Sequence, residues 1–509
     1  MAFWPSVVVA TPAHSGVGAT LTYRSELSLA PGTLVRVPLG AREVLGVVWE
    51  CPTEPPEGLS EAQTRAVASV LEGLPSLNAR WRQLVRFAAQ YYQRSLGEVA
   101  LAALPPQLRD LSTVQLARRL KKQQAARAGA ASAPADAPGQ HAPELSEEQR
   151  EALQALEAAT APVLLFGATG SGKTEVYLQL IRETLEAGKQ ALVLIPEINL
   201  GPQTLARFEQ RFNARIALLH SAVNDRERLD AWLAARDGEA DIIIGTRSAL
   251  FTPMKNPGLI IIDEEHDGSY KQQEGLRYHA RDLALVRAHQ ENIPILLGSA
   301  TPSLETLHNA LTGRYRLLRM NQRAGGARPP RMLRLDVKSL PLDSGISGPL
   351  QQAIRQTLEA GQQVLVFLNR RGFAPTLLCH DCGWLSECPR CDARMTVHQR
   401  SGVLRCHHCG YDERLPHQCP QCNHVDLRPV GAGTERAEER LKVLFPDYPI
   451  LRVDRDSTAR KDAMHNLFST IQRGQPSILV GTQMLAKGHH FPRVTLVAIL
   501  DADGGLFSA

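Results

Sequence analysis

The stretch VLLFGATGSGKTEVYLQLIRETL at residues 163–185 decides the fold expected for this chain. Its first four residues form an apolar run of strand length, and the residues after Lys173 have the spacing of an amphipathic helix. Between these runs, Gly167–Thr174 matches the pattern G-x-x-x-x-G-K-[ST]. A phosphate-binding loop requires this context of strand, glycine-rich turn and helix, so we favour it over a turn that matches the pattern by chance.

The residues of this loop predict contacts with a bound nucleotide. Gly167, Gly170 and Gly172 allow backbone N–H groups to approach phosphate oxygens, and the start of the helix adds its positive dipole. Lys173 is expected to reach the β- and γ-phosphates, and the Thr174 hydroxyl is expected to bind Mg²⁺. The loop therefore predicts ATP and Mg²⁺ as cofactors.

More apolar runs of strand length follow the loop and alternate with amphipathic helices. The runs are ALVLIP (191–196), DIIIGT (241–246), LIIID (259–263), PILLGS (294–299), QVLVFL (363–368), SILVGT (477–482) and TLVAIL (495–500). This alternation predicts an α/β fold with parallel sheets covered by helices. We expect two successive lobes, at residues 144–325 and 326–509.

The run LIIIDEEH (259–266) ends a predicted buried strand in adjacent carboxylates. Asp263 is expected to hold Mg²⁺, and Glu264 is expected to orient and activate the attacking water. The alternative is an acidic strand end that is merely solvated, and the apolar run before the acids argues against it. His266 and Gln149, the latter in LSEEQ (145–149), are weaker candidates on the pattern alone.

The composition sets limits on the class of protein. The 509 residues are 43% hydrophobic and carry a formal net charge of +5, which permits a nucleic-acid partner without requiring one. We expect no membrane span, because no apolar run reaches about 18 residues, and no secretory signal, because no basic region precedes the N-terminal apolar stretch. These features predict a cytoplasmic protein.

The sequence before the phosphate loop divides into a domain and a connector. Residues 1–52 have short strand patterns and residues 60–104 have helical periodicity, so we predict a small β-rich domain with helices over 1–104. The connector at 105–143 becomes rich in Ala, Pro, Gly and Gln, which predicts a flexible linker. The alternative, an Ala-rich helix, applies only up to about Ala131.

Eight of the nine cysteines lie within 44 residues as four Cys-x-x-Cys pairs, in an insertion at 379–424 after the first strand of the second lobe. The pairs are Cys379/Cys382, Cys388/Cys391, Cys406/Cys409 and Cys419/Cys422. The inner pairs are 14 residues apart, close to zinc-ribbon spacing, whereas the first and second pairs are only five apart. We therefore expect two nested Zn(Cys)₄ sites, one on the inner pairs and one on the outer pairs. Disulfides or an iron–sulfur cluster are the alternatives.

The remaining cysteine and the neighbouring histidines need no metal role. Eight thiolates complete two sites, so four nearby histidines are predicted not to be ligands: His380, His407, His408 and His424. Cys51 is isolated and is predicted to be a buried apolar residue.

Aromatic and cationic residues gather after the acidic run. Tyr270, Tyr278, His279 and Arg281 lie in a polar segment that also contains Gln and Gly. Aromatic rings beside cations bind single-stranded bases by stacking, so the segment is a candidate DNA contact. Scattered loop aromatics without a role are the alternative.

Seven strings from about Leu145 onward closely resemble the PriA family of bacterial primosomal replication-restart helicases. The strings are GATGSGKTEVY (167–177), LIPEINLGPQT (194–204), IIGTRSALF (243–251), DEEHDGSYKQQEG (263–275), GSATPSLET (298–306), NRRGFAP (369–375) and GTQMLAKGHHFP (481–492). The resemblance is looser over residues 1–104. It implies two RecA-like helicase lobes, an N-terminal DNA-binding domain and a zinc-binding insertion in the second lobe.

The resemblance also implies a function. Such proteins are ATP-driven 3′→5′ DNA helicases that recognise abandoned replication forks and help to reload the replicative helicase. Their implied partners are forked and single-stranded DNA, the single-stranded DNA-binding protein, PriB and DnaT, and a monomer near the nucleoid is expected.

The family's site residues carry over to matching positions. Gln149 would contact adenine, His266 and Ser299–Thr301 would couple the ATP state to DNA, and the segment around Tyr270 would sense DNA. Gly40 and Arg65 occupy plausible positions in the family's pocket for a DNA 3′ end. Phe87 and Tyr91 align with its pocket for the tail of the single-stranded DNA-binding protein; a pair of aromatics that faces the core is the alternative.

Three departures from the family pattern matter. The connector at 105–143 is too short and polar for the family's winged-helix domain, and Leu21-Thr22-Tyr23 replaces a Phe-Asp-Tyr stretch in the 3′-end pocket. The sequence also contains no Q-x-x-G-R-x-G-R segment, which supplies arginines to the γ-phosphate in the family. Weak ATP hydrolysis is therefore expected, and a fork-binding scaffold that does not unwind DNA is the alternative function. An RNA helicase is disfavoured by the cysteine array and by LIPEINLGPQT.

Overall fold

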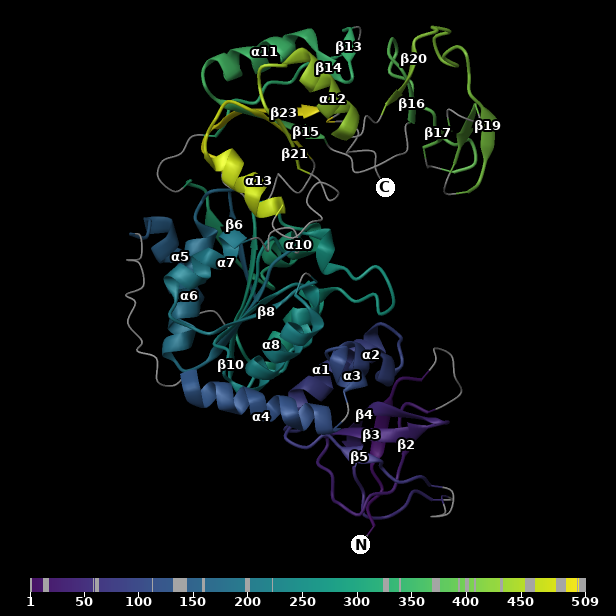
Figure 1. Ribbon diagram of the computed structural model, residues 1–509, viewed down its shortest axis with the longest axis vertical. Coiled ribbons are helices and arrows are strands. Elements are labelled where there is room, and N and C mark those ends of the chain that lie inside the picture. Colours follow the sequence, from purple (N-terminus) through teal and green to yellow (C-terminus); the bar gives the residue numbers. More distant parts are fainter. Residues whose placement is uncertain are drawn as a thin grey trace. The chain divides into compact units, whose positions relative to one another are not determined.

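The computed structural model describes two compact units, Met1–Pro329 and Pro330–Ala509 (Figure 1). The residues that it describes are 2–11, 18–57, 59, 64–111, 113–130, 144–157, 161–196, 202–221, 223–323, 329–337, 340–368, 376–391, 394–398, 402–406, 409–430, 434–453, 463–481, 491–500 and 502. The string at 369–375, most of the string at 481–492, and His407 and His408 lie outside these residues.

The centre of the first unit is a parallel sheet with the order β12-β6-β11-β10-β7-β9-β8 among the described residues. Its strands are β6 (Val163–Gly167), β7 (Gln190–Leu194), β8 (Ile216–Leu219), β9 (Ile242–Gly245), β10 (Pro257–Ile262), β11 (Ile295–Ser299) and β12 (Arg316–Met320). The five apolar runs predicted here are confirmed as strands. The edge strands β8 and β12 were not predicted, and both are less fully buried than the central strands.

Helices cover both faces of this sheet (Figure 1). They are α5 (Glu147–Glu157), α6 (Lys173–Glu186), α7 (Pro202–Arg211), α8 (Asp225–Asp237), α9 (Ala280–Glu291) and α10 (Leu304–Leu311), with short 3₁₀ helices η3 (Arg247–Phe251) and η4 (Gly268–Tyr270). Because side chains alternate along a strand, Leu259 and Ile261 of β10 pack with α5, α6 and α7, whereas Ile260 and Ile262 pack with α8 and α9. The continuous apolar runs therefore follow from burial on both faces.

An antiparallel sheet forms the N-terminal domain, with the order β2-β1-β4-β3-β5. Its strands are β1 (Ser6–Val9), β2 (Leu21–Thr22), β3 (Leu34–Leu39), β4 (Arg42–Glu50) and β5 (Ser69–Val70), followed by the helices α1 (Ala79–Tyr91), α2 (Leu96–Ala102) and α3 (Gln107–Asp110). The Asn78 side chain caps α1 and the Ser95 side chain caps α2. The helical prediction for 60–104 is wrong over residues 64–78, where β5 pairs with β3, and residues 60–63 lie outside the described chain.

The N-terminal helices and the first lobe share one hydrophobic core. Trp81 and Leu84 of α1 belong to the same buried cluster as Phe251 and Leu283. The indole Nε1 of Trp81 also donates a 2.8 Å hydrogen bond to the carbonyl of Phe251. The domain predicted over 1–104 is thus packed against the lobe that carries the phosphate loop.

The connector is not a flexible linker over 113–130, because these residues form the helix α4 (Thr113–Ala130). Leu116 is buried, and Arg119 Nε donates a 3.0 Å hydrogen bond to Asp230 of α8. Arg119 also bonds the Gln107 side chain at 2.9 Å, which ties α4 to α3. The Ala-rich helix held as the alternative is therefore correct up to Ala130, and residues 131–143 lie outside the described chain.

The second unit has a parallel sheet with the order β21-β22-β15-β23 and an antiparallel sheet with the order β19-β18-β17-β16-β20. Its elements are β13 (Leu342–Asp343), β14 (Ile346–Ser347), α11 (Gly348–Glu359), β15 (Gln363–Leu368), β16 (Thr376–Cys379), β17 (Thr396–His398), β18 (Val403–Arg405), β19 (Asp412–Arg414), β20 (Leu427–Val430), α12 (Thr434–Leu444), β21 (Ile450–Val453), α13 (Ala463–Gln472), β22 (Ile478–Gly481) and β23 (Val494–Leu500). The antiparallel sheet carries the cysteines and follows β15, as predicted for the insertion.

The lengths and the polarity of the described helices bear on whether the chain could cross a membrane. The longest described helix, α4, has 18 residues and carries basic side chains such as Arg118, Arg119 and Lys121. Within the described ranges, no helix combines the length and the apolar character needed to cross a bilayer.

Candidate nucleotide site and metal centres

The phosphate loop connects the end of β6 to the first residue of α6. Gly170 and Gly172 have positive φ angles of 83° and 87°. Residues with a Cβ atom rarely adopt such angles, whereas glycine does so readily. Gly167 is needed for space, since a Cβ there would lie 2.6 Å from Ser171 Oγ and 3.1 Å from Met320 Cβ. The structure thus gives a separate local reason for each glycine of the motif.

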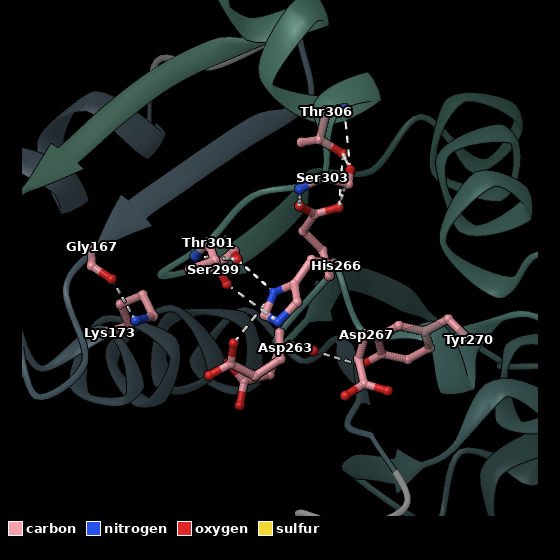
Figure 2. Close-up of polar contacts among 12 residues, drawn as sticks. Gly167, Lys173, Asp263, His266, Asp267, Tyr270, Ser299, Thr301, Ser303 and Thr306 are labelled. Carbon is pink, nitrogen blue, oxygen red and sulfur yellow. Dashed lines mark hydrogen bonds and ion pairs between the residues drawn. The ribbon is translucent and has the colours of Figure 1, made fainter. Parts of the chain in front are cut away.

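Lys173 lies within the loop that it is predicted to serve. Its Nζ donates a 2.8 Å hydrogen bond to the carbonyl of Gly167 (Figure 2). Burial lowers the pKa of this amine, while the negative charges of Glu264 and Asp263 oppose that effect. A phosphate group at the loop would supply the anion that this buried ammonium lacks. Thr174 follows in the first turn of α6 and is half-buried.

Gln149 joins the start of α5 to the phosphate loop. Its Oε1 accepts a 2.8 Å hydrogen bond from the backbone N–H of Ser146, whose hydroxyl accepts one from the N–H of Gln149 at 3.2 Å. This reciprocal pair is a capping box. Its Nε2 donates to the Gly172 carbonyl at 3.2 Å. The structure brings Gln149 to the loop, and its contact with adenine stays a prediction.

Asp263 and Glu264 follow β10 directly, at the same edge of the sheet as the phosphate loop. Tyr177 of α6 donates a 3.0 Å hydrogen bond to Asp263 Oδ1. Burial, and next the charge of Glu264, raise the pKa of Asp263 to about 6. Glu264 has a φ of 47°, a left-handed conformation that costs a non-glycine residue about 1–3 kcal/mol. Strain of this kind is concentrated at functional sites.

His266 connects the acidic motif to the segment after β11. Its Nδ1 lies 2.8 Å from Ser299 Oγ, and its Nε2 lies 3.4 Å from Thr301 Oγ1 (Figure 2). Nδ1 is also 3.6 Å from a carboxylate oxygen of Glu264. The structure therefore brings together His266, Glu264 and the Ser299–Thr301 segment, which the family resemblance predicts to act together.

Replacing Asp263 with asparagine is expected to stabilise the protein at neutral pH in the absence of Mg²⁺. The folded-state pKa of about 6 is above the ordinary value of 3.8, so the folded protein holds this proton more tightly than the unfolded chain does. The resulting stabilisation is complete below pH 3.8 and is lost as the pH rises through 6. Above that pH, the buried charge costs on the order of 3 kcal/mol, which the neutral amide avoids.

Thermal denaturation at pH 4 and pH 8 checks this prediction. The asparagine oxygen can still accept from the Tyr177 hydroxyl, so the variant changes mainly the charge. We expect a higher melting temperature than the wild type at pH 8 and a much smaller difference at pH 4. Equal differences at the two pH values would contradict it.

Glu265 is a functional candidate that the sequence analysis missed. This side chain is fully buried and accepts hydrogen bonds from the Ser303 N–H at 2.7 Å and the Thr306 hydroxyl at 2.8 Å. Arg281 Nη1 pairs with its Oε2 at 3.1 Å. The Arg281 guanidinium is therefore buried in an ion pair that connects α9 to the start of α10, and its predicted DNA contact stays a prediction.

Tyr270 and Tyr278, which are predicted to stack on bases, are both buried, at 1% and 6% exposure, and their contact with DNA stays a prediction. The Tyr270 hydroxyl lies 2.6 Å from the Asp263 carbonyl (Figure 2). It also lies 2.9 Å from the Leu194 carbonyl. The Tyr278 ring packs edge-on against Phe251. Neither ring offers an open face to a base in this structure.

His279 is half-buried, and burial lowers its pKa. Its backbone N–H donates a 3.0 Å hydrogen bond to the hydroxyl of Tyr92, next to the end of α1. Arg94 Nη2 donates to the Gly275 carbonyl at 3.2 Å. The segment predicted to contact DNA is therefore fixed at both points by the N-terminal domain, and a DNA contact of His279 stays a prediction.

Gly40 and Arg65 are brought together in the N-terminal domain. Arg65 Nη1 donates a 2.5 Å hydrogen bond to the carbonyl of Gly40, which turns from β3 to β4 with a φ of 63°. The Tyr23 ring is buried beneath this turn, and its hydroxyl donates to the Pro38 carbonyl at 3.0 Å. The structure thus places Gly40 and Arg65 next to each other, and a DNA-binding pocket there stays a prediction.

The eight clustered cysteines form two groups of four thiols in the nested arrangement predicted from the sequence. One group is Cys379, Cys382, Cys419 and Cys422, and the other is Cys388, Cys391, Cys406 and Cys409. Sγ–Sγ distances of 3.5–3.6 Å across each group are close to the about 3.8 Å separation of thiolates around a tetrahedral Zn²⁺. They far exceed the about 2.05 Å of a disulfide. The donors therefore fit two Zn²⁺ ions.

The described histidines near these groups form hydrogen bonds with backbone atoms. His380 Nε2 lies 2.7 Å from the Leu340 carbonyl, and His424 Nδ1 accepts from the Asp426 N–H at 3.4 Å. Neither belongs to the groups of four thiols. Cys51 is half-buried rather than buried, and it packs at the edge of the N-terminal core.

Comparisons with known proteins cover all three parts of the chain. Family models match at residues 6–105, 146–310 and 388–414: the 3′DNA-binding domain (3'BD), the DEAD/DEAH box helicase and the PriA DNA helicase Cys-rich region (CRR) domain. The replication restart protein PriA of Haemophilus influenzae is 42% identical over an alignment of 546 positions, gaps included. The alignment covers 95% of this chain and 74% of that protein. The chain belongs to the PriA family.

Two further PriA relatives agree with this assignment. Replication restart protein PriA of Treponema pallidum is 37% identical over 514 residues, covering 99% of this chain and 75% of that protein. The Bacillus subtilis protein of the same name is 43% identical over 368 residues, covering 70% of this chain and 46% of the relative. The family resemblance predicted from the seven strings is confirmed.

Proposed function

We propose that this chain is an ATP-dependent 3′→5′ DNA helicase that recognises stalled or abandoned replication forks and initiates primosome assembly. The observation that supports this most is the joining of the acidic motif at 263–266 to the Ser299–Thr301 segment through His266, 2.8 Å from Ser299 Oγ. This link lies at the same edge of the sheet as the phosphate loop, in a chain of the PriA family.

The nucleotide chemistry follows from the residues at the carboxyl ends of β6 and β10. The loop N–H groups and Lys173 would bind the phosphates, and Thr174 and Asp263 would hold Mg²⁺. When bound there, Mg²⁺ neutralises charge on the β- and γ-phosphate oxygens. Glu264 would orient a water molecule and accept its proton.

Coupling to DNA would use residues that contact the acidic motif. His266 contacts Ser299, Thr301 and Glu264, so a change at the γ-phosphate would reach the segment after β11. Tyr270 fixes the main chain of Asp263 and begins the segment that ends at His279. We propose that this segment responds to DNA by moving as a packed unit, rather than by stacking the two buried tyrosines on bases.

The N-terminal domain would hold the 3′ end of the nascent strand. The name of the matching family model, 3′DNA-binding domain, supports this assignment for residues 6–105. The turn at Gly40 with the Arg65 guanidinium offers a backbone and a cation close together, a combination suited to the end of a polynucleotide.

The proposed protein partners are the single-stranded DNA-binding protein, PriB and DnaT, for a monomer acting near the nucleoid. One surface supports the first of them. Tyr91 is 66% exposed, so it does not face the core, and its ring stacks on Phe87 with centroids 5.6 Å apart. The exposed Arg86 lies on the same helix. A protein tail with apolar side chains for the aromatic rings and a carboxylate for Arg86 could bind such a surface.

A strand-displacement assay tests the proposed function. Forked DNA with either a 3′ or a 5′ single-stranded arm is incubated with the chain, ATP and Mg²⁺. Since weak ATP hydrolysis is expected of this chain, we expect slow displacement, and only with the polarity of 3′→5′ movement. Lys173→Ala should abolish it. Lys173→Ala should retain DNA binding, because the substitution removes the phosphate contact and a hydrogen bond within the loop, and it changes none of the residues proposed to contact DNA.

The other outcomes separate the alternatives. Tight fork binding without ATP-dependent displacement would support the scaffold. Preference for RNA over DNA duplexes would support a different motor. The absence of both fork binding and ATP binding would overturn the proposal.

A further inference from the structure

Tyr177 lies one turn beyond Lys173 on α6, on the face of the helix that packs against the sheet. Its side chain is 2% exposed and belongs to the buried cluster on that face. A phenylalanine would fill the same apolar volume. The hydroxyl, however, lies 3.0 Å from Asp263 Oδ1 and donates a hydrogen bond to it. Packing alone does not account for this polar group.

Gly298 provides the space that the phenol occupies. It lies on β11, which is between β6 and β10 in the sheet. A Cβ at residue 298 would lie 1.6 Å from the Tyr177 hydroxyl oxygen and 2.7 Å from Cζ. Any side chain there would push the phenol away from Asp263. The glycine and the tyrosine, 121 positions apart in the sequence, therefore form a matched pair.

We propose that Tyr177 is a positioning residue for Mg²⁺ binding by Asp263. Its hydroxyl holds Oδ1 and fixes the rotation of the carboxylate, which leaves the other oxygen for the cation. Groups that hydrogen-bond a metal ligand in this way orient the ligand and raise the metal affinity. The role rests on the proposed nucleotide site, and it concerns a side chain outside the phosphate-loop pattern.

The effect is confined to the carboxylate. Asp263 is also held by its main chain, since its N–H donates to the Leu194 carbonyl at 2.9 Å and its own carbonyl is within 2.6 Å of the Tyr270 hydroxyl. The backbone should therefore stay in place when the Tyr177 hydroxyl is removed. The orientation of the side chain would be loosened, with the backbone hydrogen bond from Glu264 as its remaining support.

Titration of a fluorescent ATP analogue at a series of free Mg²⁺ concentrations tests this role. For Tyr177→Phe we expect the Mg²⁺ concentration at half-maximal nucleotide binding to rise about 10- to 100-fold. Binding of the analogue without Mg²⁺ should change less than about twofold, because the phosphate loop is intact. Tyr92→Phe is the matched control, since it removes the hydroxyl of a half-buried tyrosine that accepts from the His279 backbone N–H and does not contact Asp263.

A second variant tests the matched pair. Gly298→Ala should displace the phenol and raise the Mg²⁺ requirement as Tyr177→Phe does, and the double variant should require no more Mg²⁺ than the worse single variant. A melting curve for each protein verifies that it is folded.

The results distinguish this role from the proposed function. If the wild type binds the analogue with no dependence on Mg²⁺, the proposed nucleotide site fails. If the wild type depends on Mg²⁺ and Tyr177→Phe stays within about twofold of it, only the role of Tyr177 is overturned. The same follows if the Tyr92→Phe control weakens the Mg²⁺ response equally.

Discussion

The paired substitution Cys391→Ser with Cys406→Ser is expected to release one zinc ion and leave the other bound. Both cysteines belong to the same group of four thiols, with their sulfurs 3.5 Å apart. The outer group, which includes Cys379 and Cys422, loses nothing. Zinc per chain, measured by atomic emission after gel filtration, should fall from two to one.

The control pair, Cys391→Ser with Cys419→Ser, removes one ligand from each group and should leave no zinc. Only the nested arrangement predicts one zinc ion in the first double variant and none in the second. If neighbouring pairs shared a zinc, both double variants would lose two ions. If the first pair shared with the third and the second with the fourth, the two results would be reversed. Because a structural zinc contributes about 10–16 kcal/mol to folding in small domains, we also expect the antiparallel sheet at 376–430 to unfold when both ions are lost.

Replacing Glu264 with glutamine is expected to slow ATP hydrolysis by about 10²–10⁴-fold. Glutamine has nearly the same shape but cannot accept the proton of the attacking water. Because glutamine has nearly the same shape as glutamate, the strained backbone conformation, with a φ of 47°, and the binding of ATP should be little changed. Phosphate release under single-turnover conditions with forked DNA measures the effect.

Glu227→Gln provides the control for this substitution. Glu227 is an exposed carboxylate in the first turn of α8, outside the site and the segment proposed to respond to DNA, so its replacement removes the same charge without changing the site. Hydrolysis by this control should stay within about twofold of the wild type. A loss of less than about tenfold for Glu264→Gln would show that another group accepts the proton.

Sequence patterns predicted those parts of the fold that depend on neighbouring residues. Apolar runs such as 259–263 and 363–368 are strands because burial on both sheet faces requires continuous apolar sequence. The phosphate loop is set by its own glycines, and the cysteine groups by the lengths of chain between pairs. These predictions succeeded because short-range geometry decides each of them.

The sequence could not predict which polar or aromatic side chains become buried by distant segments. Tyr270 and Arg281 have the composition of a nucleic-acid contact, yet main-chain carbonyls bind one and Glu265 binds the other. Glu265 was missed because carboxylates are rarely fully buried unless paired. The helix α4 was mistaken for a linker because a few contacts, such as that of Arg119 with Asp230, decide its position.

The nesting of the two thiol groups has a consequence for how the insertion assembles. In the metal-free chain, the outer site must close a loop of 36 residues, between Cys382 and Cys419, whereas the inner site closes only 14. Once the inner ion is bound, only the five residues before Cys388 and the nine after Cys409 remain free within the outer loop. Closing a shorter free segment loses less chain entropy. Binding of the inner ion therefore lowers the entropic cost of closing the outer site. We expect the two sites to fill in order, the inner site first.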